Sequence, residues 1–242
     1  MPGDGLTWSI LPAAAGIALA HTVLGPDHYL PFVMLARARG WTLRRTIAVT
    51  VACGAGHVAS SLLIGFLGIL VGAAASRLEV VERARGDWAA WLLVAFGLAY
   101  AVWGVRQGLR RASSLEPHSH DAGGLHIHRD SVRPHDHSDH THGSHAGPAR
   151  PTFWVLFIVF ILGPCEPLIP LVILPASRGR WGLALVTALL FGLLTVAAMI
   201  VLTVAGVTGL RQISFGSLER LADTLAGATV AASGLAIVGL GL

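Results

Sequence analysis

The chain has 242 residues, of which 54% are hydrophobic and only 12% are charged. One soluble core of this size needs far fewer apolar residues, which excludes an ordinary soluble globular protein. The formal net charge is +4, but all seventeen basic residues are arginines and they form no basic stripe, so nucleic acid is not an expected partner. The composition therefore predicts an integral membrane protein.

Six apolar runs are long enough to cross a bilayer, which takes about twenty helical residues. In chain order they are residues 6–35, 46–75, 88–105, 153–176, 181–210 and 221–242. The stretch after Met1 contains Asp4 and no basic residue, and the first run is long, so we expect a membrane helix there rather than a cleaved signal peptide. We therefore expect an all-α membrane protein with six transmembrane helices and the lipid bilayer as a partner.

The first and fourth runs contain the same interruption. Gly25-Pro26-Asp27-His28 in the first run corresponds to Gly163-Pro164-Cys165-Glu166 in the fourth, and an arginine-bearing link that ends in tryptophan follows each copy. Proline lacks a backbone donor, so we expect helix breaks at Gly25-Pro26 and at Gly163-Pro164. The second broken run begins after three predicted spans, so the two halves would enter the membrane from opposite sides. This pattern predicts two inverted three-helix repeats, residues 1–110 and 152–242.

The arginines predict the orientation of the chain. The links on one side of the membrane carry twelve of the seventeen arginines and those on the other side carry five. Because positive charge concentrates on the cytoplasmic side, the arginine-rich side is predicted to be cytoplasmic and both termini to lie outside.

Residues 111–151 form a polar linker between the two halves, on the predicted cytoplasmic side, and hold nine of the twelve histidines. These are His118, His120, His126, His128, His135, His137, His140, His142 and His145. Such a segment buries too little apolar surface to fold alone, so we expect it to be disordered. Imidazole binds Ni, Co, Cu and Zn, and closely spaced histidines on a flexible chain can converge on one ion. The linker therefore indicates an auxiliary metal site, and a solvated spacer is the alternative.

The remaining histidines lie within the first two runs, close to Asp27. An ionised carboxylate in the membrane is costly unless a divalent cation or a proton compensates it. If the two breaks face each other, their side chains offer oxygen, nitrogen and sulfur donors, which suit a first-row divalent ion better than Mg or Ca. The predicted metal ligands are His21, Asp27, His28, His57, Cys165 and Glu166.

These residues resemble the signature of the nickel/cobalt transporter family. His21 followed by Asp27-His28 is similar to its histidine and aspartate-histidine motif, and Gly56-His57 followed by Ser60-Ser61 is similar to its second motif. Six spans with a His-rich link between the third and fourth resemble especially the nickel/cobalt efflux branch and the urease-accessory-type membrane transporters. The spacing from His21 to Asp27 is one residue longer than in the family, and the acidic motif of the second half appears here as Gly163-Pro164-Cys165-Glu166.

The resemblance covers most of the chain and implies transport of a divalent ion by a protein of the bacterial inner membrane. Ni(II) or Co(II) is the expected cargo, with Zn or Cu as further candidates, and no cofactor is implied beyond the transported ion. Efflux is slightly favoured over uptake because a cytoplasmic His-rich linker would collect ions there. The sequence is also compatible with a homo-oligomer.

Two alternatives remain. Gly163-Pro164-Cys165 also resembles the thiol-disulfide electron carriers of the cytochrome c biogenesis type, which use one such cysteine in each repeat. Here Asp27 stands at the equivalent position, and the other thiol, Cys53, lies on the second run, whereas a disulfide requires α-carbons within about 7 Å. A metal-binding accessory protein without transport is the other alternative. An enzyme is not expected, because the chain has neither a glycine-flanked serine nucleophile nor a His-Glu-x-x-His pattern.

Overall fold

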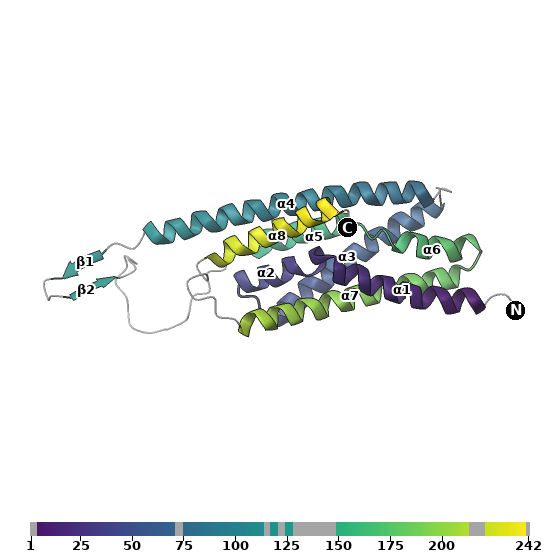
Figure 1. Cartoon of the computed structure of the whole chain (residues 1–242), viewed down its shortest axis with the longest axis horizontal. Helices are drawn as coiled ribbons and strands as arrows, with labels where there is room; N and C mark the ends of the chain where they lie inside the picture. The colour runs from purple at the N-terminus through teal and green to yellow at the C-terminus, as the bar shows by residue number, and fades with distance from the viewer. Residues whose placement is uncertain are drawn as a thin grey trace.

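The computed structural model describes residues 4–70, 75–113, 117–120, 124–127, 149–212 and 221–240. Within these ranges the chain is helical apart from two four-residue strands, and the helices lie side by side in one elongated bundle (Figure 1). Five helices are long and apolar enough to cross a membrane. They are α1 (Asp4–Leu24), α3 (Leu43–Leu70), α4 (Ala75–Ser113), α7 (Trp181–Gln212) and α8 (Ala222–Leu240). This is the architecture of a multi-pass membrane protein.

The first predicted run is broken where proline was expected to break it. Helix α1 ends at Leu24, and Gly25 then takes an extended conformation with φ −86° and ψ 95°. A single 3-10 turn, η1 (Pro26–His28), follows, and the chain becomes α-helical again in α2 (Leu30–Ala38). The polar residues of the motif therefore lie on irregular backbone.

The fourth predicted run contains two shorter helices, α5 (Ala149–Leu162) and α6 (Leu168–Ser177). The break at residues 163–167 separates them, and neither is long enough to cross a membrane alone. The described part of the chain thus has five single helices of spanning length where the sequence predicts six spans.

The third run is longer than predicted. The sequence analysis assigned residues 76–87 and the segment after Val105 to links, but α4 extends over 39 residues from Ala75 to Ser113. The predicted run began too late because α4 carries charged residues in its first turns. Glu82 is fully buried there and forms an ion pair with Arg85 inside the protein.

Helices α2 and α6 end in the same local structure. Gly40 and Gly179 have φ values of 59° and 73°, a left-handed conformation that glycine adopts without steric cost. The next residues close the same backbone hydrogen bond, from Trp41 N to Ala36 O and from Arg180 N to Pro175 O, each at 2.9 Å. These bonds define the Schellman motif, so the link after each broken segment begins with the same turn.

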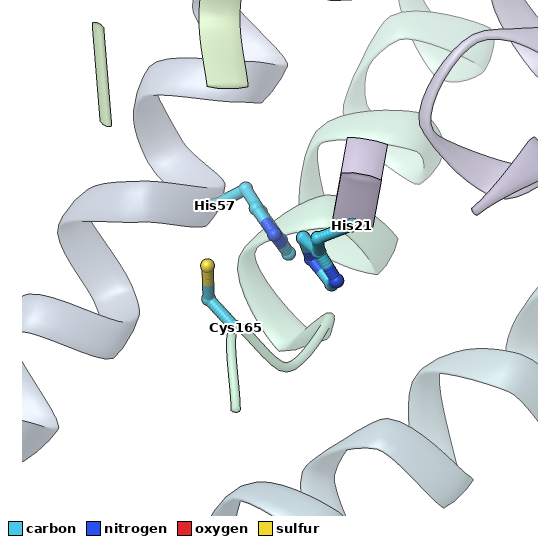
Figure 2. A group of neighbouring side chains, drawn as sticks. All are labelled: His21, His57 and Cys165. Atoms are coloured by element: carbon cyan, nitrogen blue, oxygen red, sulfur yellow. The ribbon is translucent and has the colours of Figure 1, made fainter. Parts of the chain in front are cut away.

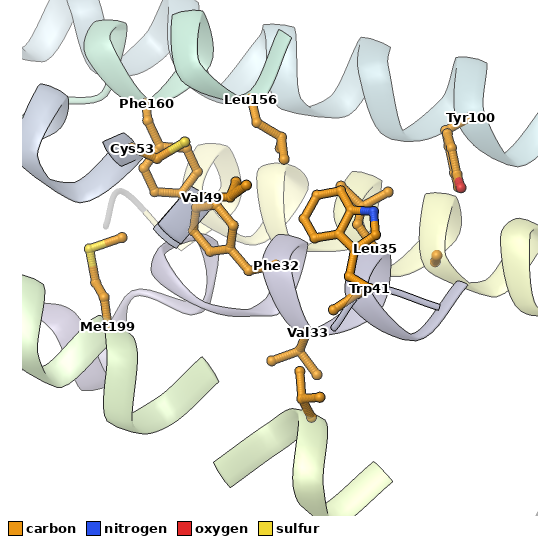
Figure 3. Close-up of a cluster of buried hydrophobic side chains, with 13 residues drawn as sticks. Phe32, Val33, Leu35, Trp41, Val49, Cys53, Tyr100, Leu156, Phe160 and Met199 are labelled. Carbon is orange, nitrogen blue, oxygen red and sulfur yellow. The ribbon is translucent and has the colours of Figure 1, made fainter. Parts of the chain in front are cut away.

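Apolar side chains from both halves of the chain form a shared core (Figure 3). Phe32 of α2 packs against Phe160 of α5 with ring centroids 4.8 Å apart, and Leu156 and Met199 belong to the same buried cluster. The two halves of the chain therefore pack against each other through one apolar core.

Two short strands lie within the predicted linker. β1 (Pro117–His120) pairs antiparallel with β2 (Gly124–Ile127), and His118 lies opposite His126. In these eight residues the two strands pair along their backbones. The other linker histidines, His128, His135, His137, His140, His142 and His145, lie outside the described residues.

Candidate metal centre

Three predicted ligands lie together near the middle of the bundle. One ring nitrogen from each of His21 and His57 and the sulfur of Cys165 all lie within 4.8 Å of one another. Figure 2 shows the three side chains converging from separate segments: α1, α3 and the break between α5 and α6. Two imidazoles and a thiolate form a donor set that suits a first-row divalent ion.

The fold brings these residues together through close backbone approach at the second break. His21 lies in the last turn of α1, and His57 is buried in α3. A Cβ added at Gly163 would lie 3.1 Å from Nδ1 of His57, so glycine lets the break approach that ring. Cys165 follows directly and is fully buried.

His28 adds a third imidazole to the cluster. The centroid of its ring lies 4.7 Å from that of His21 and 5.2 Å from that of His57, in edge-on arrangements. All three histidines outside the linker thus lie together, although α1, η1 and α3 supply one each.

The Nε2 atoms of His21, His28 and His57 are buried and have no hydrogen-bond partner within the described part of the chain. The opposite ring nitrogens of two of them face oxygen atoms. Nδ1 of His28 lies 3.2 Å from both Gly25 O and Asp27 Oδ1, and Nδ1 of His57 lies 3.2 Å from Phe160 O. Because these oxygens accept, Nδ1 donates, which leaves the Nε2 lone pair free. Metal-binding histidines are commonly oriented in this way.

The two predicted carboxylate ligands are placed differently from the three clustered residues. Asp27 accepts the hydrogen bond from His28 and so orients that ring. The side chain of Glu166 is 42% exposed, and its Oε1 lies 4.0 Å from Nε of Arg83. Neither belongs to the group of His21, His57 and Cys165. Their roles as direct ligands stay predictions.

A cavity of about 220 Å³ lies between the two breaks. His21, Asp27, His28 and His57 line it from the first half of the chain, and Gly163, Pro164 and Glu166 line it from the second. α4 and α8 contribute apolar walls through Leu93 and Ile237. The polar groups of both breaks therefore border one space, as the sequence pattern suggested.

The buried polar residues that bind the backbone at Cys165 were not predicted from the sequence. Glu82 is fully buried, and its Oε2 accepts hydrogen bonds from Ser61 Oγ at 3.0 Å and from Cys165 N at 3.1 Å. Arg85 binds Glu82 and reaches the break as well. The available signal was the spacing of three between Glu82 and Arg85, which puts opposite charges on one helix face next to an apolar run.

Comparison with known proteins gives no further assignment. No family model, curated protein or solved structure matches this chain.

Proposed function

We propose that this protein transports a divalent transition-metal ion, Ni(II) or Co(II), through the cavity between its two helix breaks. The observation that carries the proposal is the cluster of His21, His57 and Cys165, whose ligand atoms lie within 4.8 Å of one another in the bundle. Imidazole and thiolate bind such ions at about 2.0–2.3 Å, so small side-chain rotations would bring all three onto one ion.

The unpaired Nε2 atoms support this proposal. Buried polar atoms nearly always have a partner, and three unpaired imidazole nitrogens facing one region would be costly without a ligand. Nitrogen and sulfur donors also disfavour Mg and Ca, which prefer oxygen. Zn(II) and Cu(II) suit the same donors, so they belong in any comparison of substrates.

A six-span architecture with inverted repeats is part of the proposal, with α5 and α6 together as one span. Several contacts between the two halves are paired as a two-fold axis would require: α3 packs on α7 and α4 on α8, while α1 packs on α7 as α5 packs on α3. Helix α1 also begins at the end of the bundle where α6 lies (Figure 1), which fits opposite directions for the two broken segments. In such transporters the halves rock around a central site.

Ion and proton would compete for the same lone pairs. A thiol must lose its proton and an imidazole must be neutral to bind a metal, so loading the site releases protons and protonation favours release of the ion. A proton gradient could drive flux in this way. In the proposed orientation both termini lie outside the inner membrane and the His-rich linker lies in the cytoplasm. The linker would then collect cytoplasmic ions for efflux.

Flux measurements test the proposal. Proteoliposomes loaded with a fluorescent metal indicator should show uptake of Ni or Co in a comparison with Zn, Cu and Mn. A His28→Ala/His57→Ala variant should lose this flux, whereas Cys53→Ser, in a separate buried cluster, should keep it. Absence of flux for every ion would contradict transport, and tight binding without flux would favour a metal-binding accessory protein.

A thiol-disulfide electron carrier is the second candidate, because Cys165 is a free, buried thiol after a proline at a helix break. The other thiol, Cys53, lies in a different buried cluster. Cys165→Ser should abolish electron transfer completely, whereas metal transport should only weaken or change its ion preference.

A further inference from the structure

At the second helix break, the donor and the acceptor of one backbone hydrogen bond are separated. In a continuous α-helix each N–H donates to the carbonyl four residues earlier, so Cys165 N would donate to Ile161 O. Here α5 ends at Leu162 and this bond is not made. Pro164 has no N–H either, and Phe160 O accepts from Gly163 N at 3.1 Å and from Nδ1 of His57 at 3.2 Å.

The ion pair of Glu82 and Arg85 binds both the donor and the acceptor of the missing hydrogen bond. Cys165 N donates to Oε2 of Glu82 at 3.1 Å, and Ile161 O accepts from Nη2 of Arg85 at 2.6 Å. Glu82 and Arg85 are three residues apart on α4 and bind each other. The ion pair thus stands where the direct hydrogen bond between the two sides of the break would be.

The ion pair is itself held rigidly. Ser61 Oγ donates to Glu82 at 3.0 Å, and Ser60 Oγ accepts from Arg85 at 2.9 Å, so α3 fixes both members. Glu82 is fully buried and the Arg85 side chain is only 14% exposed. A buried pair with this many hydrogen bonds has one low-energy geometry, which it imposes on the backbone that it binds.

From this geometry we infer that Glu82 and Arg85 are positioning residues that hold the break open and thereby keep the Cys165 sulfur in the metal site with His21 and His57. The inference rests on the proposed metal site and deepens it. Without the pair, Cys165 N loses Glu82 Oε2 as its acceptor, and the backbone can turn the sulfur away. The site would then bind ions through nitrogen alone and lose its preference for thiophilic metals.

Cobalt spectroscopy on the purified full-length chain tests the inference. Co(II) bound to a thiolate absorbs in the near ultraviolet by sulfur-to-metal charge transfer, while its visible d–d bands report the coordination geometry. We expect Glu82→Leu/Arg85→Met, which removes both charges together, to lose the charge-transfer band as Cys165→Ser does and to keep d–d bands. Arg77→Gln, an exposed position on the same helix, is the matched control and should keep both. A double variant with the full charge-transfer band would overturn the inference, whereas a wild type without any cobalt spectrum would overturn the proposed metal site.

Thiol alkylation without metal distinguishes the positioning role of the ion pair from the proposed metal site. In a Cys53→Ala background, Cys165 is the single thiol and is fully buried, so a small alkylating reagent should react slowly. We expect the double variant to react on the order of tenfold faster, because the break opens locally more often. Cys53 in a Cys165→Ala background is the control for global unfolding and should stay slow. Equal Cys165 rates with and without the pair would contradict the positioning role, whatever the metal results.

Arg85→Lys covers the case in which the double variant does not fold. Lysine keeps the charge but lacks the fork that binds Glu82 and Ile161 O at once. We expect intermediate alkylation and a weakened charge-transfer band. Wild-type behaviour in both measurements would show that the fork is not needed and would overturn the inference.

Discussion

The three clustered histidines differ in what orients them. His28 is fixed by a carbonyl and a carboxylate, and His57 by Phe160 O near the end of α5, which also accepts from Gly163 N. His21 relies on ring contacts with the other two. The first break therefore orients His28, and the end of α5 orients His57 although that residue belongs to the first half.

Asp27→Ala tests the orientation of His28. Without the carboxylate, Nδ1 keeps only Gly25 O as acceptor, and loss of such an outer partner typically lowers metal affinity about 10–100-fold. Competition titration of Co(II) against a chelating dye measures the change. Complete loss of binding would instead identify Asp27 as a direct ligand, and unchanged affinity would remove it from the site.

Gly25→Ala tests the close approach at the first break. A Cβ at this position would lie 2.5 Å from Nδ1 of His28 and 2.9 Å from Asp27 Oδ1, so the ring must move. We expect weaker Co(II) binding with helix content unchanged by circular dichroism. Gly16→Ala on α1 has no atom within 4 Å of the added carbon and should bind as the wild type does. Equal affinities for the two variants would contradict this account.

At the scale of helices, α4 and α8 approach each other at backbone distance. A Cβ at Gly97 would lie 2.3 Å from Ala231 N, and one at Gly227 would lie 2.3 Å from Ala101 N. Small residues let two membrane helices approach at backbone distance. This contact joins the last helix before the linker to the last described helix after it.

Gly97→Val should therefore destabilise the protein strongly. Overpacking costs typically about 1–3 kcal/mol, and backbone atoms cannot move aside as side chains can, so we expect the upper end of that range or more. The free energy of unfolding in mixed micelles measures the effect. Gly108→Val, also on α4 but with open space around it, should cost far less; a similar loss at both positions would point to helix propensity instead.

At the scale of the whole molecule, both halves of the chain contribute residues to the proposed metal site. Protonation of a residue from either half should therefore weaken metal binding. Cys165 must lose its proton to bind, and His21 and His57 must be neutral. Affinity for Co(II) should therefore rise with pH, with at least one proton released for each ion bound. Calorimetric titration in buffers of different ionisation enthalpy counts the protons. Binding without proton release would exclude Cys165 thiolate as a ligand.

The linker is expected to serve the site from outside the bundle. Deleting residues 116–147 should raise the ion concentration needed for half-maximal flux without abolishing transport, because auxiliary histidines only concentrate the ion. Initial rates in proteoliposomes over a range of ion concentrations measure this. Complete loss of flux would mean that the linker forms part of the pathway. An unchanged dependence of the rate on ion concentration would indicate that the linker is only a spacer.

The sequence by itself determined the features that depend on local chemistry. Apolar length predicts membrane helices, and a glycine followed by a proline, which lacks an N–H, interrupts them at Pro26 and Pro164. The histidines could be selected in advance because an imidazole in an apolar run is rare.

Only the tertiary structure decided which of the candidates meet. Cys165 rather than its neighbour Glu166 joins His21 and His57, because side-chain direction on irregular backbone depends on what the backbone binds. That partner is Glu82, 83 residues earlier in the chain, on a segment whose charges looked like those of a loop. Such a contact is set by helix packing, which local sequence patterns do not encode.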